Sequence, residues 1–374
     1  MSVTVFTMTH KKFPTPGDPV YVPLQVGRAK GEDLGYMKDD TGVSISEKNC
    51  YYGELTGVYW IWKNIRTSDY VGICHYRRYF CTEEGRILTG AEYEKILSEY
   101  DIITSKKLKL NYSYYEGYAG NHNIRDLDVI GEILQKMYPD YYETFVRLVH
   151  DKGTYFGNMM VCTKALYDEY CQWLFSIFEM AEEKIDASGY DDYHKRVYGF
   201  ISEFLLYVWV QVRGLKVYEC KVGMTDEKRE TAEIKERLAA FFAKKDIAGA
   251  KDYILSCLEK RPDVLMEASD ITGELKLSMQ VIAVCELEQE AYGSSIIDRI
   301  QAFDALMEYF RKLNDLVIAS QNGEFDTFSP AKVEFYLRNA EITDIALEVS
   351  ARLFCTPQEA KKVVQTVRNF GKCT

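Results

Sequence analysis

The sequence predicts an α/β domain with a mostly parallel sheet, followed by an all-helical C-terminal domain. Before residue 225, short apolar runs alternate with helical patterns, which is typical of helices flanking a parallel sheet. Beyond that point the chain is rich in Ala, Leu, Glu and Lys, with apolar residues about 3.6 positions apart. All five His and all four Trp precede residue 225. We therefore expect two domains, 1–228 and 229–374.

Short apolar runs mark the expected strands, and amphipathic segments mark the expected helices. The strand candidates are residues 3–8, 70–74, 101–104, 158–162 and 215–222. Residues 53–65 and 164–185 each place apolar side chains on one helical face. In the second domain, residues 329–340 and 356–371 open with Ser-Pro and Thr-Pro, typical starts of a helix. Because ligands of parallel sheets bind beyond the carboxyl ends of strands, residues that follow the strands are the candidates for a site.

Composition excludes several classes of protein. The formal net charge of −11 argues against a nucleic-acid-binding protein, because phosphate neutralisation requires clustered Lys and Arg. No segment approaches the roughly 18–20 consecutive apolar residues of a membrane span. The ten Cys include no C-x-x-C pair, which is typical of reduced thiols and not of disulfides or a zinc site. We therefore expect a cytoplasmic protein without a nucleic-acid partner.

Polar side chains gather in two segments of the first domain. Asp39 and Asp40 precede a predicted helix, where they could bind a ribose, a sugar or a metal, or could cap the helix in a solvated turn. Asn121 and His122 form a polar loop able to hydrogen-bond a sugar. The Asp-Leu-Asp at 126–128 matches a short metal-binding pattern, but it opens an apparent helix, where Asp stabilises the positive N-terminal end. We favour the helix-opening interpretation of this segment.

Two further residues lie next to expected ligand-binding positions. Asn158 follows Gly157 before an apolar strand, where it either exchanges hydrogen bonds with a ligand or belongs to a turn. Glu203 lies within a largely apolar helix, and burial there would raise its pKa and suit it to general-base chemistry. The alternative for Glu203 is an exposed face shared with His194 and Arg196.

Long motifs in a fixed order give a resemblance to a known family. They are TMTHKKF, VPLQVGRA, DDTGVSISEKNCYYGELTGVYWIWKN, YVGICHYRRYF, GNMMV and YHKRVYGFISEFLLYVWV, within residues 3–225. Together they resemble the bacterial domain-of-unknown-function 4422 family, which is grouped with capsular and exopolysaccharide glycosyltransferases. The resemblance implies a GT-A-like, Rossmann-type sheet and a nucleotide-sugar donor. Some members look like galactofuranosyltransferases, so UDP-galactofuranose is the candidate donor.

The resemblance and the chemistry of the residues together give expected roles for individual positions. The expected donor-binding residues are Thr7, Thr9, His10, Asp39, Asp40, His75, Arg77 and Arg78. The expected sugar- or acceptor-binding residues are Asn121, His122, Asn158 and Arg196. Glu203 is the expected catalytic base, by analogy with the acidic base of inverting GT-A enzymes, and Asp191 and Asp192 are its substitutes.

The segment CHYRRYF, residues 74–80, ends a predicted strand and bears on metal use. Many GT-A enzymes hold a divalent ion with two carboxylates at this strand end, whereas this motif offers His75, Arg77 and Arg78 and no carboxylate. Guanidinium groups fit phosphate oxygens and repel a cation. We therefore expect Arg and His to stabilise a leaving diphosphate, with no metal or other cofactor required. Since neighbours on a strand point to opposite sides, we expect only one of Arg77 and Arg78 to reach the diphosphate. The alternative is that both arginines form salt bridges beneath the site.

The sequence thus predicts a glycosyltransferase of surface-polysaccharide synthesis, in the cytoplasm or at the inner face of the membrane. Its partners would be a nucleotide-sugar donor and a glycan or polyprenyl-linked acceptor. The helical tail would bind partners, form a homo-oligomer or contact the membrane surface. Two alternatives stay open: a non-catalytic scaffold that binds nucleotide sugar or glycan, and a phosphotransferase that uses His75 as its nucleophile.

Overall fold

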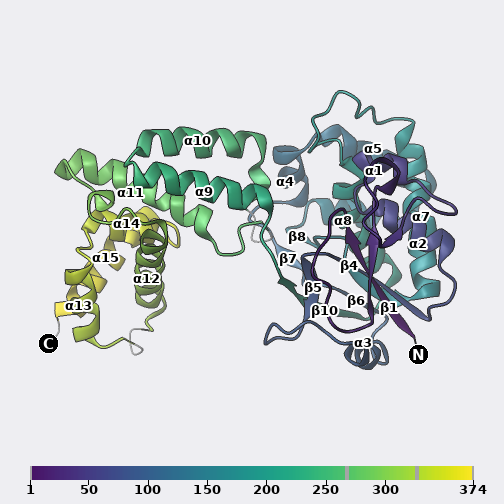
Figure 1. Cartoon of the computed structure of the whole chain (residues 1–374), viewed down its shortest axis with the longest axis horizontal. Helices are drawn as coiled ribbons and strands as arrows, with labels where there is room; N and C mark the ends of the chain where they lie inside the picture. Colours follow the sequence, from purple (N-terminus) through teal and green to yellow (C-terminus); the bar gives the residue numbers. More distant parts are fainter. Residues whose placement is uncertain (1, 266–268, 325–327, 373–374) are drawn as a thin grey trace. The chain divides into compact units, whose positions relative to one another are not determined.

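The computed structural model describes residues 2–265, 269–324 and 328–372 and divides into two compact units, Met1–Thr225 and Asp226–Thr374 (Figure 1). The first unit mixes helices and strands, whereas the described residues of the second form only helices and their connections. The predicted succession of an α/β part and an all-helical part is therefore confirmed.

The first unit is built around an eight-stranded sheet in the spatial order β3-β2-β1-β4-β5-β10-β6-β9. Its strands are β1 Val3–Thr9, β2 Tyr21–Gln25, β3 Met37–Lys38, β4 Tyr70–His75, β5 Arg78–Cys81, β6 Ile102–Ser105, β9 Met160–Thr163 and β10 Val217–Met224. β9 also pairs with β4, so β4, β5, β10, β6 and β9 close into a small barrel-like ring. A separate pair joins β7 Leu108–Lys109 to β8 Gly153–Thr154.

The strands of the large sheet do not all run in one direction. β1 is parallel to β2 and β4, β2 is parallel to β3, and β10 is parallel to β6. β5 and β9 run against their neighbours. The expected parallel strands are present, but the sheet is mixed, which corrects the expectation of a mostly parallel sheet. β5 follows β4 after a turn of two residues, too short for the crossover that a parallel neighbour requires.

Alternate residues of the central strands face two hydrophobic clusters. In β1, Phe6 and Met8 join the larger cluster, whereas Val5 joins the smaller one. The helices that supply the larger cluster are α1 Asn49–Tyr52, α2 Leu55–Asn64, α4 Tyr114–Asn121, α5 Ile124–Met137, α6 Pro139–Val149, α7 Lys164–Glu182 and α8 Val197–Arg213. α3 Gly90–Leu97 covers the smaller cluster. Helices thus lie on both faces of the sheet.

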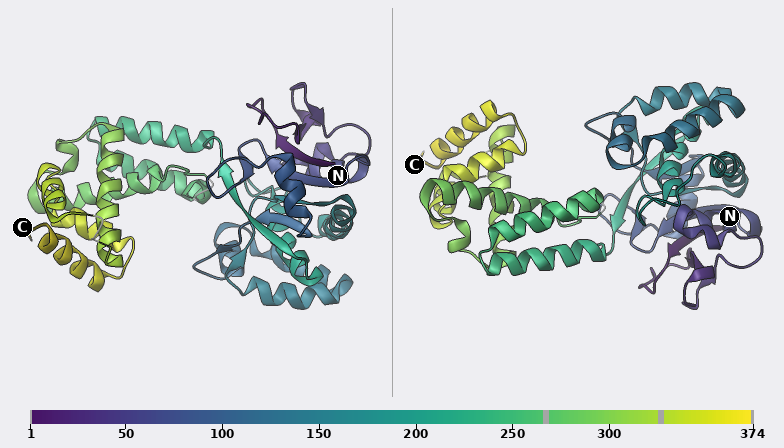
Figure 2. Two further views of the ribbon diagram at one scale, coloured as in Figure 1. Left: turned by 90° about the horizontal axis from the view of Figure 1, so that it is seen from below. Right: turned by 90° about the horizontal axis from the view of Figure 1, so that it is seen from above.

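The second unit has its own hydrophobic cluster, formed by its helices and the connections between them. Its helices are α9 Arg229–Ala243, α10 Ile247–Lys260, α11 Glu274–Tyr292, α12 Phe303–Asn322, α13 Pro330–Asn339, α14 Asp344–Arg352 and α15 Pro357–Lys372. α9 and α10 lie side by side in Figures 1 and 2 and pack together. α13 begins as the sequence predicts, because the Ser329 side chain accepts a hydrogen bond from the Lys332 amide and Pro330 follows it. No helix in the described ranges combines the length and apolar character required to cross a membrane.

Candidate active site

Charged side chains gather at one edge of the large sheet, where the carboxyl ends of the parallel strands β1, β2, β3 and β4 lie together. β9 runs against β4, with Met160 opposite Ile73, so the residues before β9 reach the same edge. The start of α2 and the first turns of α8 approach this edge through side-chain contacts. We define the sheet-edge site as Glu54, His75, Arg78, Gly157, Asn158 and Glu203.

The β4–β5 turn separates the two arginines of CHYRRYF. His75 ends β4 and pairs with Arg78, the first residue of β5, across a turn formed by Tyr76 and Arg77. Arg77 is 9% exposed, and its guanidinium carbon lies 5.4 Å from the centre of the Tyr76 ring. The hairpin therefore gives the two arginines different surroundings, as the sequence predicts, although it does so through a turn and not through alternation along one strand.

Arg78 is the cation of the sheet-edge site that is suited to bind a ligand. Its backbone pairs with His75 and Met224 in the sheet, whereas its guanidinium forms no hydrogen bond or ion pair with any residue in the described ranges. A Cβ atom added to Gly157 would lie 3.4 Å from one of its terminal nitrogens. Burial lowers the pKa of Arg78, the Glu203 carboxylate opposes that shift, and Arg77 adds to it. A half-buried guanidinium that no carboxylate neutralises at contact distance favours an anionic ligand.

The Gly157–Asn158 turn holds the site together through its backbone. Both residues have left-handed conformations, with φ of 94° and 48°, which Gly and Asn tolerate better than other residues. The Gly157 amide donates a hydrogen bond to Glu203 Oε1 over 2.9 Å. The His75 Nε2 group donates to the Gly157 carbonyl. The backbone of Gly157 therefore holds both the Glu203 carboxylate and the His75 imidazole.

The Asn158 side chain is fully engaged within the protein. Its Nδ2 group donates to Glu54 Oε1 over 2.7 Å and to the Gly199 carbonyl over 3.0 Å. Its Oδ1 atom accepts a hydrogen bond from the Ser202 hydroxyl over 2.8 Å. Asn158, expected to bind sugar, thus joins the turn to α8 and to the start of α2.

Glu203 has the electrostatic properties of a proton acceptor near neutral pH. Burial raises the pKa of Glu203 to about 7, and the Glu54 carboxylate acts in the same direction. Arg78, the Gly157 amide and Arg196 oppose the shift. Burial also lowers the pKa of His75, and both arginines of the hairpin reinforce this, so His75 is neutral where Glu203 titrates.

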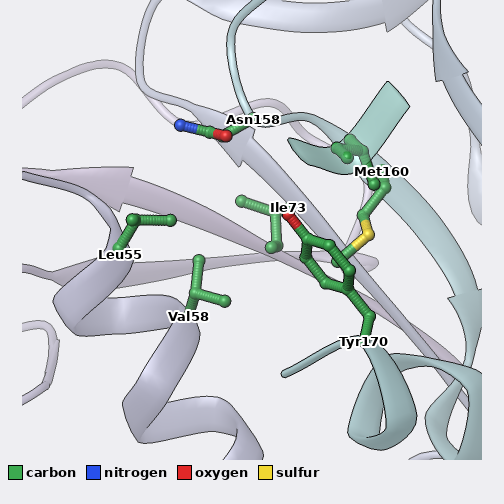
Figure 3. Close-up of a pocket in the computed structure, with 7 residues that line it drawn as sticks. Leu55, Val58, Ile73, Asn158, Met160 and Tyr170 are labelled. Atoms are coloured by element: carbon green, nitrogen blue, oxygen red, sulfur yellow. The ribbon is translucent and has the colours of Figure 1, made fainter. Parts of the chain in front are cut away.

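Apolar side chains pack beneath Asn158. A cavity of about 10 Å³ lies below Asn158, among Leu55, Val58, Ile73, Met160, Tyr170 and Leu206. Figure 3 shows the Asn158 amide at its edge, with apolar side chains of α2, β4 and β9 around it. The cavity has room for one water molecule at most, so the floor of the site is closed.

Several residues expected to bind the donor are engaged within the fold. The Thr7 hydroxyl lies 3.3 Å from Cys74 Sγ, and the Thr9 hydroxyl donates to the Lys11 carbonyl. Asp39 accepts hydrogen bonds through both oxygens, from the amides of Gly27 and Arg28 and from the hydroxyls of Ser46 and Thr56. These contacts fix the loops after β2 and β3.

His10 and Asp40 lie at the surface of the same edge. The His10 ring packs edge-on against Tyr76, with 5.3 Å between the ring centres. Asp40 lies 3.9 Å from a terminal nitrogen of Arg28. Thr9 is the last residue of β1 and His10 follows it, so the structure places them beside the β4–β5 turn.

A second cluster contains the expected acceptor-binding residues and the two substitute bases. His194 donates to Asp191 Oδ2 over 2.7 Å and to the Asn121 carbonyl over 2.9 Å. The backbone amide of His194 also donates to Asp191, over 2.9 Å, and this bond together with the imidazole lowers the pKa of the Asp191 carboxyl. Asp192 is exposed and lies 3.9 Å from Lys195. Neither Asp shares the buried setting of Glu203.

Arg196 connects this cluster to the sheet-edge site. Its guanidinium carbon lies 5.1 Å from the centre of the Phe200 ring, and His122 stacks on the same ring at 4.3 Å. Arg196 acts electrostatically on both Glu203 and Arg78. The structure thus brings Arg196 and His122 together with Glu203, one turn of α8 away from Phe200.

Sequence reasoning missed two residues of the site, Glu54 and Gly157 as a hydrogen-bonding backbone, and it missed Ser202, which donates to Asn158. Glu54 precedes the apolar helix α2 much as Glu203 interrupts the apolar helix α8. The same signal, an acidic residue beside an apolar helical run, was therefore present at Glu54. The backbone role of Gly157 has no side-chain signature.

No cluster of three or more His, Cys, Asp or Glu side chains within the described residues is arranged to hold a metal ion. The Asp-x-Asp residues have other partners: Asp126 accepts from the Tyr190 hydroxyl over 3.0 Å, and Asp128 from the Tyr115 hydroxyl over 3.1 Å. Both lie in the first turns of α5, in agreement with the helix-opening interpretation.

Fold and site together define an α/β protein with a charged site at the carboxyl ends of parallel strands. Residues 4–214 match the model of a family described as a domain of unknown function, DUF4422. The chain therefore belongs to the DUF4422 family. No curated protein matches it significantly.

A solved structure of the bifunctional glycosyltransferase WbbM, in its apo form, resembles the chain with a TM-score of 0.55 and 31% sequence identity. The match covers 61% of this chain and 46% of that one. This chain thus spans about half the length of the protein it resembles.

Proposed function

We propose that the first unit is a glycosyltransferase with a GT-A-like fold that moves a sugar from a UDP-linked donor to an acceptor hydroxyl. The observation that carries this proposal is Glu203, whose carboxyl has a pKa of about 7 beside the guanidinium of Arg78. A base that titrates near neutral pH and a cation for a leaving diphosphate are the two groups that this reaction needs. The resemblance of the chain to the glycosyltransferase WbbM supports the same class of reaction.

In this proposal, Arg78 binds the donor diphosphate and neutralises the charge that develops as it leaves. Glu203 accepts the proton of the acceptor hydroxyl while that oxygen bonds to the anomeric carbon and the carbon–diphosphate bond breaks. Arg77 and neutral His75 lie beside the diphosphate position. With the two arginines in place, the reaction needs no divalent metal.

The substrates follow from the family resemblance. The donor is a UDP-hexose, with UDP-galactofuranose as the first candidate, and the acceptor is a glycan or a polyprenyl-linked sugar of capsular or exopolysaccharide synthesis. Arg196 and His122 lie on the acceptor side of Glu203. The helical unit would serve as a surface for partners, for a second copy or for the membrane.

The His75 phosphotransferase would have to use Nδ1 as its nucleophile, because Nε2 of His75 donates to the Gly157 carbonyl. The non-catalytic scaffold makes a different prediction from the enzyme, since it binds donor without releasing UDP.

A panel of nucleotide sugars tests the proposal directly. Thermal shift and UDP release are measured for UDP-galactofuranose, UDP-galactose, UDP-glucose and GDP-mannose, each with EDTA and with Mn²⁺. We expect a UDP-sugar to raise the melting temperature and to release UDP equally in EDTA and Mn²⁺. Stabilisation without UDP release supports the scaffold, and activity lost in EDTA and restored by Mn²⁺ contradicts the metal-free mechanism.

A further inference from the structure

Glu54 is a second carboxylate of the sheet-edge site, and it performs no step of the proposed reaction. It occupies the N-cap position of α2, where the helix dipole favours a negative charge. Its Oε1 atom accepts the Asn158 Nδ2 hydrogen bond over 2.7 Å, and this is the one hydrogen bond of its side chain within the described residues. One carboxyl oxygen of Glu54 is therefore held in place by Asn158, and within the described residues no Lys or Arg forms an ion pair with Glu54.

Glu54 and Glu203 are held by consecutive residues of the same turn. Gly157 donates its amide to Glu203, and Asn158 donates its side-chain amide to Glu54. The left-handed conformations of both turn residues, with φ of 94° and 48°, fix the directions of these two donors. The turn thus holds one oxygen of Glu203 and one oxygen of Glu54 at the same place in the fold.

Other charged groups face Glu203 from every element around it. Arg78 of β5 and Arg196 before α8 favour its ionised form, whereas Glu54 at the start of α2 disfavours it. Glu203 in turn acts on the phenol of Tyr114 in α4. His75 of β4 is neutral, since burial lowers its pKa. Glu54 is the anion of this group that opposes the ionisation of Glu203.

We propose that Glu54 is a positioning residue that acts through Glu203: its carboxyl group, which Asn158 holds at the same turn that binds Glu203, strengthens Glu203 as a proton acceptor. The catalytic meaning of this role rests on the proposed glycosyltransferase function. Glu54 itself exchanges no proton and forms no bond with substrate. It makes the Glu203 carboxylate a stronger base than the two nearby arginines alone would allow.

Titration of the Glu203 carboxyl tests this role without any substrate. The full-length protein is labelled with ¹³C at Glu side-chain carboxyls, and the Glu203 signal is assigned by its loss in Glu203→Gln. We expect Glu54→Gln, which retains the acceptor for Asn158, to lower the Glu203 midpoint by about one pH unit. Glu54→Ala should lower it as well, and Glu54→Asp should leave it near the wild-type value. Glu47→Gln, at an exposed carboxylate of the same unit, is the matched control.

An unchanged Glu203 midpoint in both Glu54→Gln and Glu54→Ala would overturn the inference. A second readout is the acidic limb of the kcat/KM profile, which should move to lower pH in Glu54→Gln together with the titration. A purely structural role would lower activity at all pH values and leave the limb in place. If the Glu203 midpoint moves but the nucleotide-sugar panel shows no UDP release, the proposed function fails and the coupling between Glu54 and Glu203 stands. If UDP is released but the Glu203 midpoint stays in place, only this coupling fails.

Discussion

The burial of the Glu203 carboxyl has a cost to stability. This carboxyl is drawn out of water on α8, over an apolar floor, and one hydrogen bond from Gly157 holds it. Burial of a carboxylate without a contact ion pair destabilises the charged form. A residue of this kind is typical of active sites, where groups that perform chemistry are not the most stable choice for the fold.

The pH dependence of stability follows from this position. The Glu203 pKa is about 7 in the folded protein, against an ordinary value of 4.5. The folded state therefore binds this proton more tightly, and the resulting stability is present below pH 4.5 and is lost as the pH rises to about 7. Gln carries no charge at any pH and retains the acceptor for Gly157. We expect Glu203→Gln to be more stable than the wild type above about pH 7, with a difference that disappears below pH 4.5.

Thermal unfolding followed by Trp fluorescence measures this, because all four Trp lie in the first unit. Glu47→Gln, at an exposed carboxylate, should show no such pH dependence. An equal difference between Glu203→Gln and wild type across about pH 4–8 would show that Glu203 titrates normally.

At the scale of elements, the Gly157–Asn158 turn does most to assemble the site. It precedes β9, contacts β4 through His75, and reaches α2 and α8 through Asn158. Because these elements are far apart in the sequence, the site forms only when the turn has its left-handed conformation.

Two substitutions separate the backbone and side-chain contributions of Asn158. Asn158→Ala removes three hydrogen bonds and places Ala in a left-handed conformation, so we expect a loss of about 2–4 kcal/mol in the free energy of unfolding. Asn158→Gly accepts the conformation and should lose about 1 kcal/mol less. Denaturant unfolding followed by Trp fluorescence measures both, with exposed Asn111→Ala as control. If Asn158→Ala matched the wild type, the turn would not be what holds the site together.

The elements show what the sequence can predict and what it cannot. Five apolar runs identified β1, β4, β6, β9 and β10, because buried strands need continuous apolar side chains. An apolar run does not specify its direction, so the antiparallel course of β9 was not predictable. β5 was missed because the polar CHYRRYF segment hides a turn of two residues between strands.

The candidate site was predictable where its chemistry lies in side chains. Glu203, His75 and Arg78 were identified because each is an ionisable residue beside an apolar run. Asp39 looks like a ligand-binding residue in the sequence, but its four hydrogen bonds within the fold become visible only in three dimensions. The link between Glu54 and Glu203 depends on a turn that lies far beyond Glu54 in the chain, and no local pattern encodes it.

At the scale of the whole molecule, the chain consists of two units with separate hydrophobic clusters. The family match and every residue of the sheet-edge site belong to the first unit. The proposed function therefore resides in residues 1–225, and the helical unit is expected to influence where the protein acts, not the chemistry.

The central claim is that Glu203 takes the proton of the acceptor while Arg78 binds the diphosphate. The most direct measurement is turnover of the UDP-sugar identified by the panel, with UDP affinity determined in parallel, for Glu203→Gln and Arg78→Gln of the full chain. We predict that Glu203→Gln lowers kcat by about 100-fold or more and leaves the Kd for UDP unchanged. Arg78→Gln should weaken UDP binding about tenfold or more, as expected for a charged hydrogen-bond donor to phosphate. Wild-type kcat in Glu203→Gln, or unchanged UDP affinity in Arg78→Gln, would contradict the account.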